Sequence, residues 1–323
     1  MPRALVTGGA GFIGSHVADR FLAGGYDVEI IDDLSSGRRE NVPTASVFHE
    51  LDVSSPGALD IVRRGSFDVI VHLAAQMDVR KSVTDPVRDA TINILGTLRL
   101  IEAIRQAAPR CRVVFTSTGG AVYGTFANPP TPETHAKEPE SPYAISKLSA
   151  EYYLAYYFRL YGLESVVLRF GNVYGPRQDP HGEAGVVSIF CNRLLDGRPL
   201  TVFGDGLQTR DYIHVADVVE AAWLGATKLL SPEEGLDSHA FNIGTAIGTN
   251  VLDLASHLQR AARTNLPLEF APKRPGEQQE SFIAIDKARR VLGWEPKVAL
   301  PDGLANTYEW FAANRLTGAI AKS

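Results

Sequence analysis

The stretch Arg-Ala-Leu-Val-Thr-Gly-Gly-Ala-Gly-Phe-Ile-Gly-Ser-His at residues 3–16 decides the fold. It begins with the apolar residues of a buried strand, passes through a glycine-rich turn and continues with helical spacing over residues 12–23. Gly9, Gly11 and Gly14 form the pattern G-x-G-x-x-G, and Gly8 offers an alternative first glycine. Such a turn brings the backbone close to a pyrophosphate that faces the helix N-terminus. The stretch therefore predicts a dinucleotide site.

A carboxylate lies where the ribose of that dinucleotide is expected. Asp32 follows the last glycine of the turn by 18 residues, at the end of the predicted second strand, where it would accept hydrogen bonds from a ribose diol. It would repel a 2′-phosphate, so NAD is favoured over NADP. Arg38 and Arg39 would instead favour NADP, because they could neutralise that phosphate. They lie several residues into the next loop, however. Residues 52–53, after the third strand, are the expected adenine contact.

The first half of the chain alternates strand-like and helix-like segments. Because each crossover helix must cover a sheet face, this alternation predicts an α/β fold with a Rossmann-type, doubly wound parallel sheet. The expected strands are 3–6, 26–31, 47–51, 67–73, 112–116 and 164–169, and the expected helices are 12–23, 87–108 and 142–161.

The alternation ends near residue 171, where loops rich in Gly, Pro and Asn separate single helices near 186–196, 215–230 and 251–263. This pattern predicts a smaller α/β substrate lobe over the carboxyl ends of the strands, where open α/β sheets bind ligands. We expect a dinucleotide-binding domain at 1–170, with a returning segment near 210–230, and a second lobe made mainly of 171–323.

Composition excludes several classes of protein. The chain has 323 residues, 45% of them hydrophobic, and a net charge of 32 − 37 = −5 with scattered basic residues, which argues against a nucleic-acid partner. Cys111 and Cys191 lie in apolar surroundings without CxxC spacing, so we expect buried thiols and no metal site. There is no apolar run of about 18 residues and no signal-peptide pattern, so we expect a cytoplasmic protein without a membrane span.

Tyr143 and Lys147 are the candidate catalytic pair. They are four residues apart on a predicted helix and therefore share one face. This helix follows the fifth strand, which ends in Thr-Ser-Thr-Gly-Gly at residues 116–120. In a doubly wound fold, the end of this strand and the start of the next helix meet beside the nicotinamide half of the dinucleotide site.

The residue types suit hydride removal from a secondary alcohol. A free tyrosine titrates near 10, so it is a poor base at neutral pH unless a neighbouring ammonium stabilises the phenolate. Lys147 would do this for Tyr143 and would also bind the nicotinamide ribose. A hydroxyl from Thr118, or from the neighbouring Ser117, would share the proton and orient the substrate.

Several motifs together carry a family resemblance. The glycine turn, Tyr143-x-x-x-Lys147, Asn93-x-x-Gly-Thr97, Arg169-Phe-Gly-Asn172 and Arg210-Asp-Tyr-Ile-His214 resemble extended short-chain dehydrogenase/reductases, most closely the bacterial UDP-glucose (UDP-galactose) 4-epimerases. The resemblance covers about residues 3–310. It implies Tyr143 as the base, Lys147 as the group that tunes it and Thr118 as the hydroxyl partner, with Ser117 as the alternative.

The resemblance also implies NAD as the cofactor and assigns its contacts. Met77 departs from the pattern, because some relatives have a pyrophosphate-binding lysine there. The expected NAD-binding residues are Gly8, Gly11, Phe12, Ile13, Gly14, Asp32, Asp33, Ser36, Gly37, Asp52, Val53, Leu73, Ala74, Ala75, Gln76, Asn93, Tyr143 and Lys147.

The second lobe is expected to hold a nucleoside diphosphate sugar. Arg210 and Arg274 are the candidate diphosphate ligands, since a planar guanidinium matches phosphate oxygens, although Asp211 could instead pair with Arg210. Resemblance implies that small Ser281 admits an N-acetylated sugar. The expected substrate-binding residues are Thr118, Tyr143, Asn172 at the inner phosphate or sugar, Val187, Arg210, Arg274, Glu277 at the nucleotide ribose, and Ser281.

The residues after Thr118 bear on the reaction. Related dehydratases and decarboxylases place acidic side chains there, whereas Gly119 and Gly120 cannot transfer a proton. This favours epimerisation at C4 of a UDP-hexose through a 4-keto intermediate. UDP-glucuronate 4-epimerisation or decarboxylation, and a non-catalytic NAD-binding regulator, remain the alternatives. The identity of the base, uracil or thymine, stays open.

The helix that carries Tyr143 has a second apolar face. At about 100° per residue, Ile145, Tyr152, Tyr156 and Leu160 lie broadly opposite Tyr143. A helix on one sheet face buries only one side, so this second face predicts a homodimer, with burial under the second lobe as the competing explanation.

Overall fold

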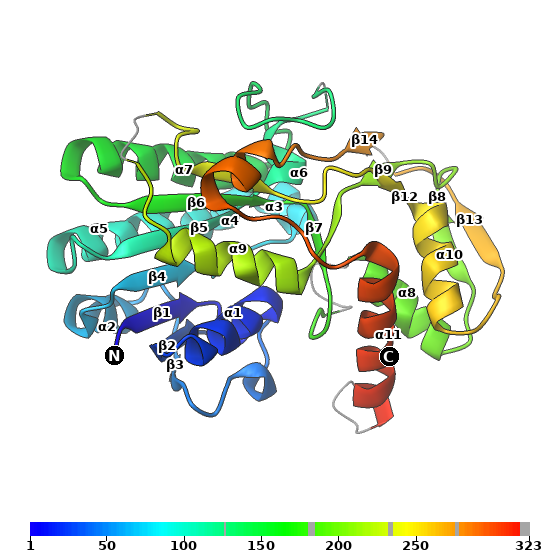
Figure 1. Cartoon of the computed structure of the whole chain (residues 1–323), viewed down its shortest axis with the longest axis horizontal. Coiled ribbons are helices and arrows are strands. Elements are labelled where there is room, and N and C mark those ends of the chain that lie inside the picture. The colour runs from blue at the N-terminus through cyan, green and yellow to red at the C-terminus, as the bar shows by residue number, and fades with distance from the viewer. Residues whose placement is uncertain (126, 180–184, 232–234, 275–277, 317–323) are drawn as a thin grey trace.

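A seven-stranded sheet forms the centre of the molecule (Figure 1). The computed structural model describes residues 1–125, 127–179, 185–231, 235–274 and 278–316. The strand order is β11-β6-β5-β4-β1-β2-β3 and every neighbouring pair is parallel. The strands are β1 (Arg3–Thr7), β2 (Asp27–Asp32), β3 (Val47–Glu50), β4 (Val69–His72), β5 (Arg112–Thr118), β6 (Ser165–Phe170) and β11 (Ala240–Ile243).

The six predicted strands and their parallel arrangement are confirmed. The seventh strand, β11, is not among the predicted ones. β11 lies outside the segment near 210–230 that was expected to return to this domain. All of its residues are buried, yet the strand has only four residues. A run this short carries little periodic signal.

Helices cover both faces of the sheet, as a parallel sheet requires. On one face, Val17 and Phe21 of α1 share an apolar core with Val218 of α9. On the other, Val62 of α2, Leu100 of α5 and Leu154 of α7 share a second core. These helices are α1 (Phe12–Ala23), α9 (Val215–Thr227), α2 (Pro56–Gly65), α5 (Thr97–Ala107) and α7 (Pro142–Tyr161).

The long helix expected at 87–108 is interrupted. The structure has α4 (Pro86–Ala90), then a π-helical segment η2 (Thr91–Gly96), then α5. Inside the π segment the Asn93 amide donates to Asp89 Oδ1 at 3.0 Å and to the Gln76 carbonyl at 2.7 Å. Sequence periodicity does not separate α from π geometry, and π segments often occur at functional sites.

The smaller lobe packs around its own apolar core at one end of the sheet (Figure 1). It is built from α8 (Val186–Leu195), α10 (Val251–Ala261) and the unpredicted α11 (Leu300–Leu316), with the strand pair β8 (Leu200–Phe203) and β13 (Leu268–Ala271). A small sheet joins β12 (Thr249–Asn250), β9 (Thr209–Arg210) and β14 (Glu280–Ser281). The remaining elements are η1 (Arg39–Asn41), α3 (Val79–Thr84), α6 (Gly119–Val122), β7 (Asn172–Tyr174), β10 (Tyr212–His214) and η3 (Ala288–Leu292).

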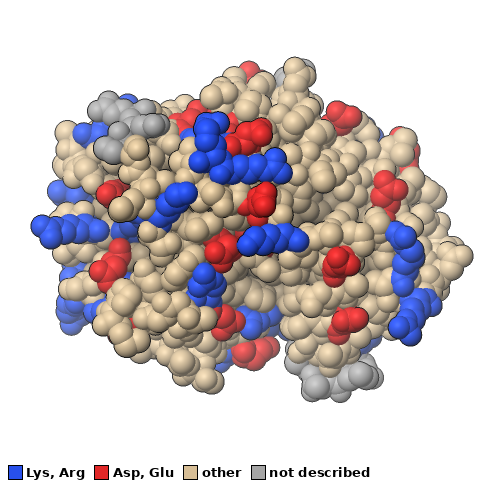
Figure 2. Space-filling view, in the orientation of Figure 1, with Lys and Arg blue, Asp and Glu red and all other residues tan. Residues whose placement is uncertain are grey.

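Acidic and basic side chains are interspersed over the face shown in Figure 2. Cys111 and Cys191 are both buried free thiols, as expected. Among the described helices, none is long and apolar enough to span a bilayer.

Candidate active site

A cleft of about 1390 Å³ opens where the carboxyl ends of the strands meet the smaller lobe. It brings together residues from the glycine turn, the strand ends, α7 and the second lobe. Of the residues expected at a site, those lining it are Gly8, Gly11, Phe12, Ile13, Gly14, Asp32, Asp33, Ser36, Asp52, Val53, Leu73, Ala74, Ala75, Gln76, Ser117, Thr118, Tyr143, Lys147, Asn172, Val187, Arg210, Arg274 and Ser281.

The glycine turn has a backbone that only glycine allows. Gly8 has φ +73°, and a Cβ there would lie 2.8 Å from the Ala74 nitrogen. A Cβ on Gly14 would lie 2.1 Å from the Gly8 carbonyl oxygen, so α1 packs directly on the turn. The turn therefore presents bare backbone to the cleft at the N-terminus of α1, which is the geometry that a pyrophosphate needs.

Asp32 is held in place by the same turn. Its carboxylate accepts from the Ala10 and Leu34 backbone N–H groups, each at 2.9 Å, and burial raises the pKa of this carboxyl. Arg38 forms an ion pair with Asp179 at 3.5 Å, and the Arg39 guanidinium stacks over Phe48 at 4.0 Å. Both arginines thus have partners of their own, which supports NAD over NADP.

Two of the expected cofactor contacts lie behind the cleft lining. A Cβ on Gly37 would lie 2.8 Å from Asp32 Oδ1, so this glycine packs against the Asp32 carboxylate. Asn93 is buried and exchanges two hydrogen bonds with the Gln76 backbone, at 2.9 and 2.7 Å. Gly37 thus contacts Asp32 and Asn93 holds Gln76, and both Asp32 and Gln76 line the cleft. Glu277 lies outside the described residues.

Tyr143 and Lys147 lie at the start of α7 and both line the cleft. Lys147 is buried, and its Nζ donates to the Thr116 carbonyl at 3.0 Å while lying 5.9 Å from the centre of the Tyr143 ring. The Tyr143 backbone N–H donates to Ser82 Oγ at 3.2 Å, and Ser141 caps the helix. The ammonium and the phenol thus share one wall of the site, as their spacing predicts.

The two candidate hydroxyls on β5 have different surroundings. Ser117 is buried and its hydroxyl donates to Glu151, on the α7 side of the strand. Both residues line the cleft, but Thr118 is half-buried at the strand end and is more exposed than Ser117. This geometry favours Thr118 as the hydroxyl available to a ligand.

The second lobe contributes two guanidinium groups. Arg210 Nη1 donates to the carbonyls of Thr209 and Gln278 at 2.8 and 2.9 Å. The alternative partner, Asp211, accepts from the backbone and side chain of Thr245, each at 2.7 Å. The Arg274 guanidinium lies 3.8 Å over the Phe203 ring. Both arginines reach the cleft, where a diphosphate could bind.

Sequence reasoning missed several lining residues, among them Gln178, Phe203, Gln208 and Tyr212. They lie in loops and short strands of the second half, where no periodic pattern marks them. The stacking of Arg274 on Phe203 could not be inferred, because 71 residues separate the two in the chain.

Comparisons with known proteins agree with this geometry. The family model described as "NAD dependent epimerase/dehydratase family" matches residues 4–244. UDP-glucose 4-epimerase of Mycolicibacterium smegmatis is 46% identical over 314 residues, covering 96% of this chain and 98% of the relative.

Two solved structures have similar folds. UDP-glucose 4-epimerase of Thermotoga maritima, solved with UDP-glucose, has a TM-score of 0.90 and 44% identity, covering 97% of this chain and 99% of its own. The Thermus thermophilus UDP-glucose 4-epimerase, solved with NAD, has a TM-score of 0.88 and 42% identity, covering 96% and 99%.

Proposed function

Since this chain belongs to the NAD dependent epimerase/dehydratase family, we propose that it is an NAD-dependent UDP-sugar 4-epimerase that interconverts UDP-glucose and UDP-galactose. The single observation that carries the proposal is the placement of Tyr143, Lys147 and Thr118 on the same cleft as the glycine turn and Asp32. The bare backbone of the turn and the carboxylate of Asp32 suit the pyrophosphate and ribose of NAD.

In the proposed reaction Tyr143 takes the proton of the sugar 4-hydroxyl and later returns it. NAD, when bound, accepts the C4 hydride and gives it back to the opposite face of the 4-keto sugar, so no net oxidation occurs. Lys147 stabilises the phenolate by its charge, and Thr118 donates to or accepts from the reacting oxygen. Proton and hydride both return to the sugar, which balances the reaction.

The second lobe would hold the nucleotide. Arg210 and Arg274 are placed to bind the diphosphate, and Asn172 the inner phosphate or the sugar. Ser281 and Asn172 border the space beside Gly120, where a Cβ would meet Ser281 Oγ at 3.7 Å and Asn172 Oδ1 at 3.9 Å. A small Ser281 supports turnover of UDP-N-acetylglucosamine as well.

Gly119 and Gly120 favour epimerisation over decarboxylation, because neither can transfer a proton where related enzymes have acidic groups. A relative that binds UDP-glucuronic acid, the UDP-glucuronic acid 4-epimerase of Bacillus cereus, has a TM-score of 0.86 but lower identity, 30%. The intact Tyr143, Lys147 and Thr118 argue against a non-catalytic regulator.

Product analysis by NMR tests the proposal. Purified protein supplied with UDP-galactose should form UDP-glucose, and UDP-glucuronate should release no CO₂. Conversion of UDP-glucuronate alone would replace the proposed substrate, and bound NAD without turnover of any UDP-sugar would support the regulator. UDP-N-acetylglucosamine in the same assay tests the role of Ser281, and strict specificity for UDP-glucose and UDP-galactose would contradict it.

We further propose a homodimer. Ile145, Tyr152, Tyr156 and Leu160 of α7 are 49%, 57%, 43% and 56% exposed, so the smaller lobe does not cover them. A row of large apolar side chains on one helix is costly to leave in water, and a second copy of the same helix would cover it.

A further inference from the structure

A fully buried ion pair lies behind the wall of the cleft that carries Tyr143 and Lys147. The Arg169 guanidinium of β6 contacts both carboxylate oxygens of Glu151 on α7, and neither side chain is exposed. Removing two charges from water costs about as much as their attraction returns, so such a pair contributes little net stability. It does fix geometry, because both groups must keep their partners.

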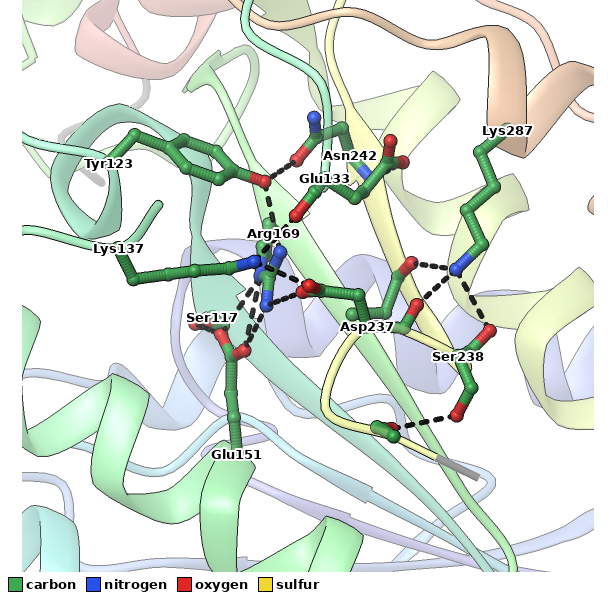
Figure 3. A network of polar contacts seen from close by, with 12 residues as sticks. Ser117, Tyr123, Glu133, Lys137, Glu151, Arg169, Asp237, Ser238, Asn242 and Lys287 are labelled. Atoms are coloured by element: carbon green, nitrogen blue, oxygen red, sulfur yellow. Dashed lines mark hydrogen bonds and ion pairs between the residues drawn. The ribbon is translucent and has the colours of Figure 1, made fainter. Parts of the chain in front are cut away.

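The ion pair binds Ser117 and Tyr123 (Figure 3), which lie before and after Thr118 in the sequence. Ser117, the residue before Thr118, donates its hydroxyl to Glu151. Tyr123, which follows the short α6 turn after Thr118, accepts from Arg169 Nη1 at 3.0 Å and donates to Asn242 at 2.7 Å. Thr118 is thus held between two residues bound to one ion pair. We call Ser117, Tyr123, Glu151 and Arg169 the anchor network.

The same network ties α7 to β5. Glu151 follows Lys147 by one helical turn and Tyr143 by two, so all three belong to one rigid helix. Lys147 Nζ donates to the Thr116 carbonyl at 3.0 Å, while Glu151 accepts from Ser117. Two successive residues of β5 therefore bind α7, and the residue after them is Thr118.

We propose that the anchor network positions the Thr118 hydroxyl against Tyr143 and Lys147, with Glu151 as its central positioning residue. No member of the network has to touch the substrate for this role. The inference rests on the proposed epimerase function. Small displacements of reacting groups lower the rate strongly, by up to about a hundredfold per ångström, so loosening the network should lower kcat more than it changes KM.

The test uses two variants that each remove one hydroxyl from the network, Ser117→Ala and Tyr123→Phe, in the NAD-loaded enzyme. The matched control is Tyr157→Phe, on the same helix: Tyr157 is also buried and donates to Glu102 at 2.9 Å, away from the cleft. With UDP-galactose we expect kcat to fall roughly tenfold in both network variants, with KM changed less than about twofold. Ser117→Thr, which restores the hydroxyl, should recover most of kcat.

Other outcomes overturn the inference. If the network variants keep the kcat of Tyr157→Phe, or if kcat merely follows Tm across all three variants, the network serves only stability. If Ser117→Ala abolishes turnover while Tyr123→Phe has no effect, Ser117 is itself the catalytic hydroxyl. Wild-type protein that does not convert UDP-galactose would refute the proposed function, and this inference with it.

Discussion

At the scale of single residues, His72 shows how the chain separates structural from catalytic groups. It lies near the reacting groups, but it is buried between the hydroxyls of Thr7 at 2.7 Å and Thr97 at 3.0 Å. Burial, and then the charge of Lys147, lower the pKa of His72 to about 3. The imidazole therefore stays neutral at physiological pH and serves as a hydrogen-bonding group inside the core.

The lowered pKa of His72 makes a prediction about stability. The folded protein keeps His72 neutral, while in the unfolded chain this residue takes up a proton below its ordinary pKa of 6.5. The contribution of His72 to the free energy of unfolding is therefore fully present above pH 6.5 and is lost progressively as the pH falls toward 3. Lowering the pH from about 7.5 to 5 should therefore reduce the free energy of unfolding by roughly 2 kcal/mol through His72 alone. Urea unfolding of wild type and His72→Gln at both pH values measures it.

The His72→Gln variant should be less stable at neutral pH but should lose less stability on acidification. The comparison between the two proteins removes the effect of other groups, such as Glu133, whose pKa is raised by burial and acts in the opposite direction. Equal pH dependence in both proteins would contradict the neutral state of His72.

At the scale of elements, α7 carries most of the proposed function. Ser141 caps it by accepting from the Ala144 N–H at 3.2 Å, Pro142 occupies its first turn, and Gly162 with φ +68° ends it. Its cleft-facing side holds Tyr143 and Lys147, and its exposed side holds the proposed dimer surface. The cap, the proposed catalytic pair and the proposed dimer surface therefore belong to one helix.

The cap of α7 can be tested against a matched cap elsewhere. Ser55 caps α2 in the same way, accepting from Ala58 at 3.3 Å, and lies outside the proposed catalytic groups. Ser141→Ala and Ser55→Ala should each cost about 1 kcal/mol, seen as a fall of a few degrees in Tm. Only Ser141→Ala should also lower kcat severalfold, because Tyr143 lies in the first turn. Equal kcat in both variants would contradict the link between the cap and the reaction.

The sequence was informative where residues repeat with a period or follow a glycine pattern. The turn at Gly8 to Gly14 and the strand-helix alternation of the first half were predictable for this reason. The π segment around Asn93 and strand β11 were not, because their cause is long-range: a buried amide bonded to Gln76, and pairing with β6. The direction of the Ser117 hydroxyl likewise depends on Glu151, 34 residues away.

At the scale of the whole molecule, the sheet and the smaller lobe have separate cores, and the cleft lies between them. Arg210 and Arg274 approach it from the second lobe, while Tyr143 and Lys147 approach from the first. None of the residues of the proposed dimer surface on α7 lines this cleft, so a dimer formed there would leave the cleft open. Its exposed apolar side chains make the assembly testable without disturbing the site.

Charged substitutions on this surface should produce monomers. Tyr152→Arg combined with Leu160→Arg places two like charges on the exposed face of α7 in each copy. Sedimentation velocity at micromolar concentration should show a dimer for wild type and a monomer for the variant. Phe270→Arg, which changes a side chain 62% exposed on β13 of the smaller lobe, is the control and should remain dimeric. A wild-type monomer would refute the proposed assembly.

The role of Tyr143 as the base is the central claim, and its most direct test is the turnover of Tyr143→Phe with UDP-galactose, measured beside its bound NAD. Removing the phenolic oxygen leaves the glycine turn and Asp32 intact, so NAD content should equal that of wild type. Turnover should fall by roughly a thousandfold or more, near the upper range of general-base effects. A variant that keeps its NAD and retains kcat within about tenfold of wild type would contradict the assignment.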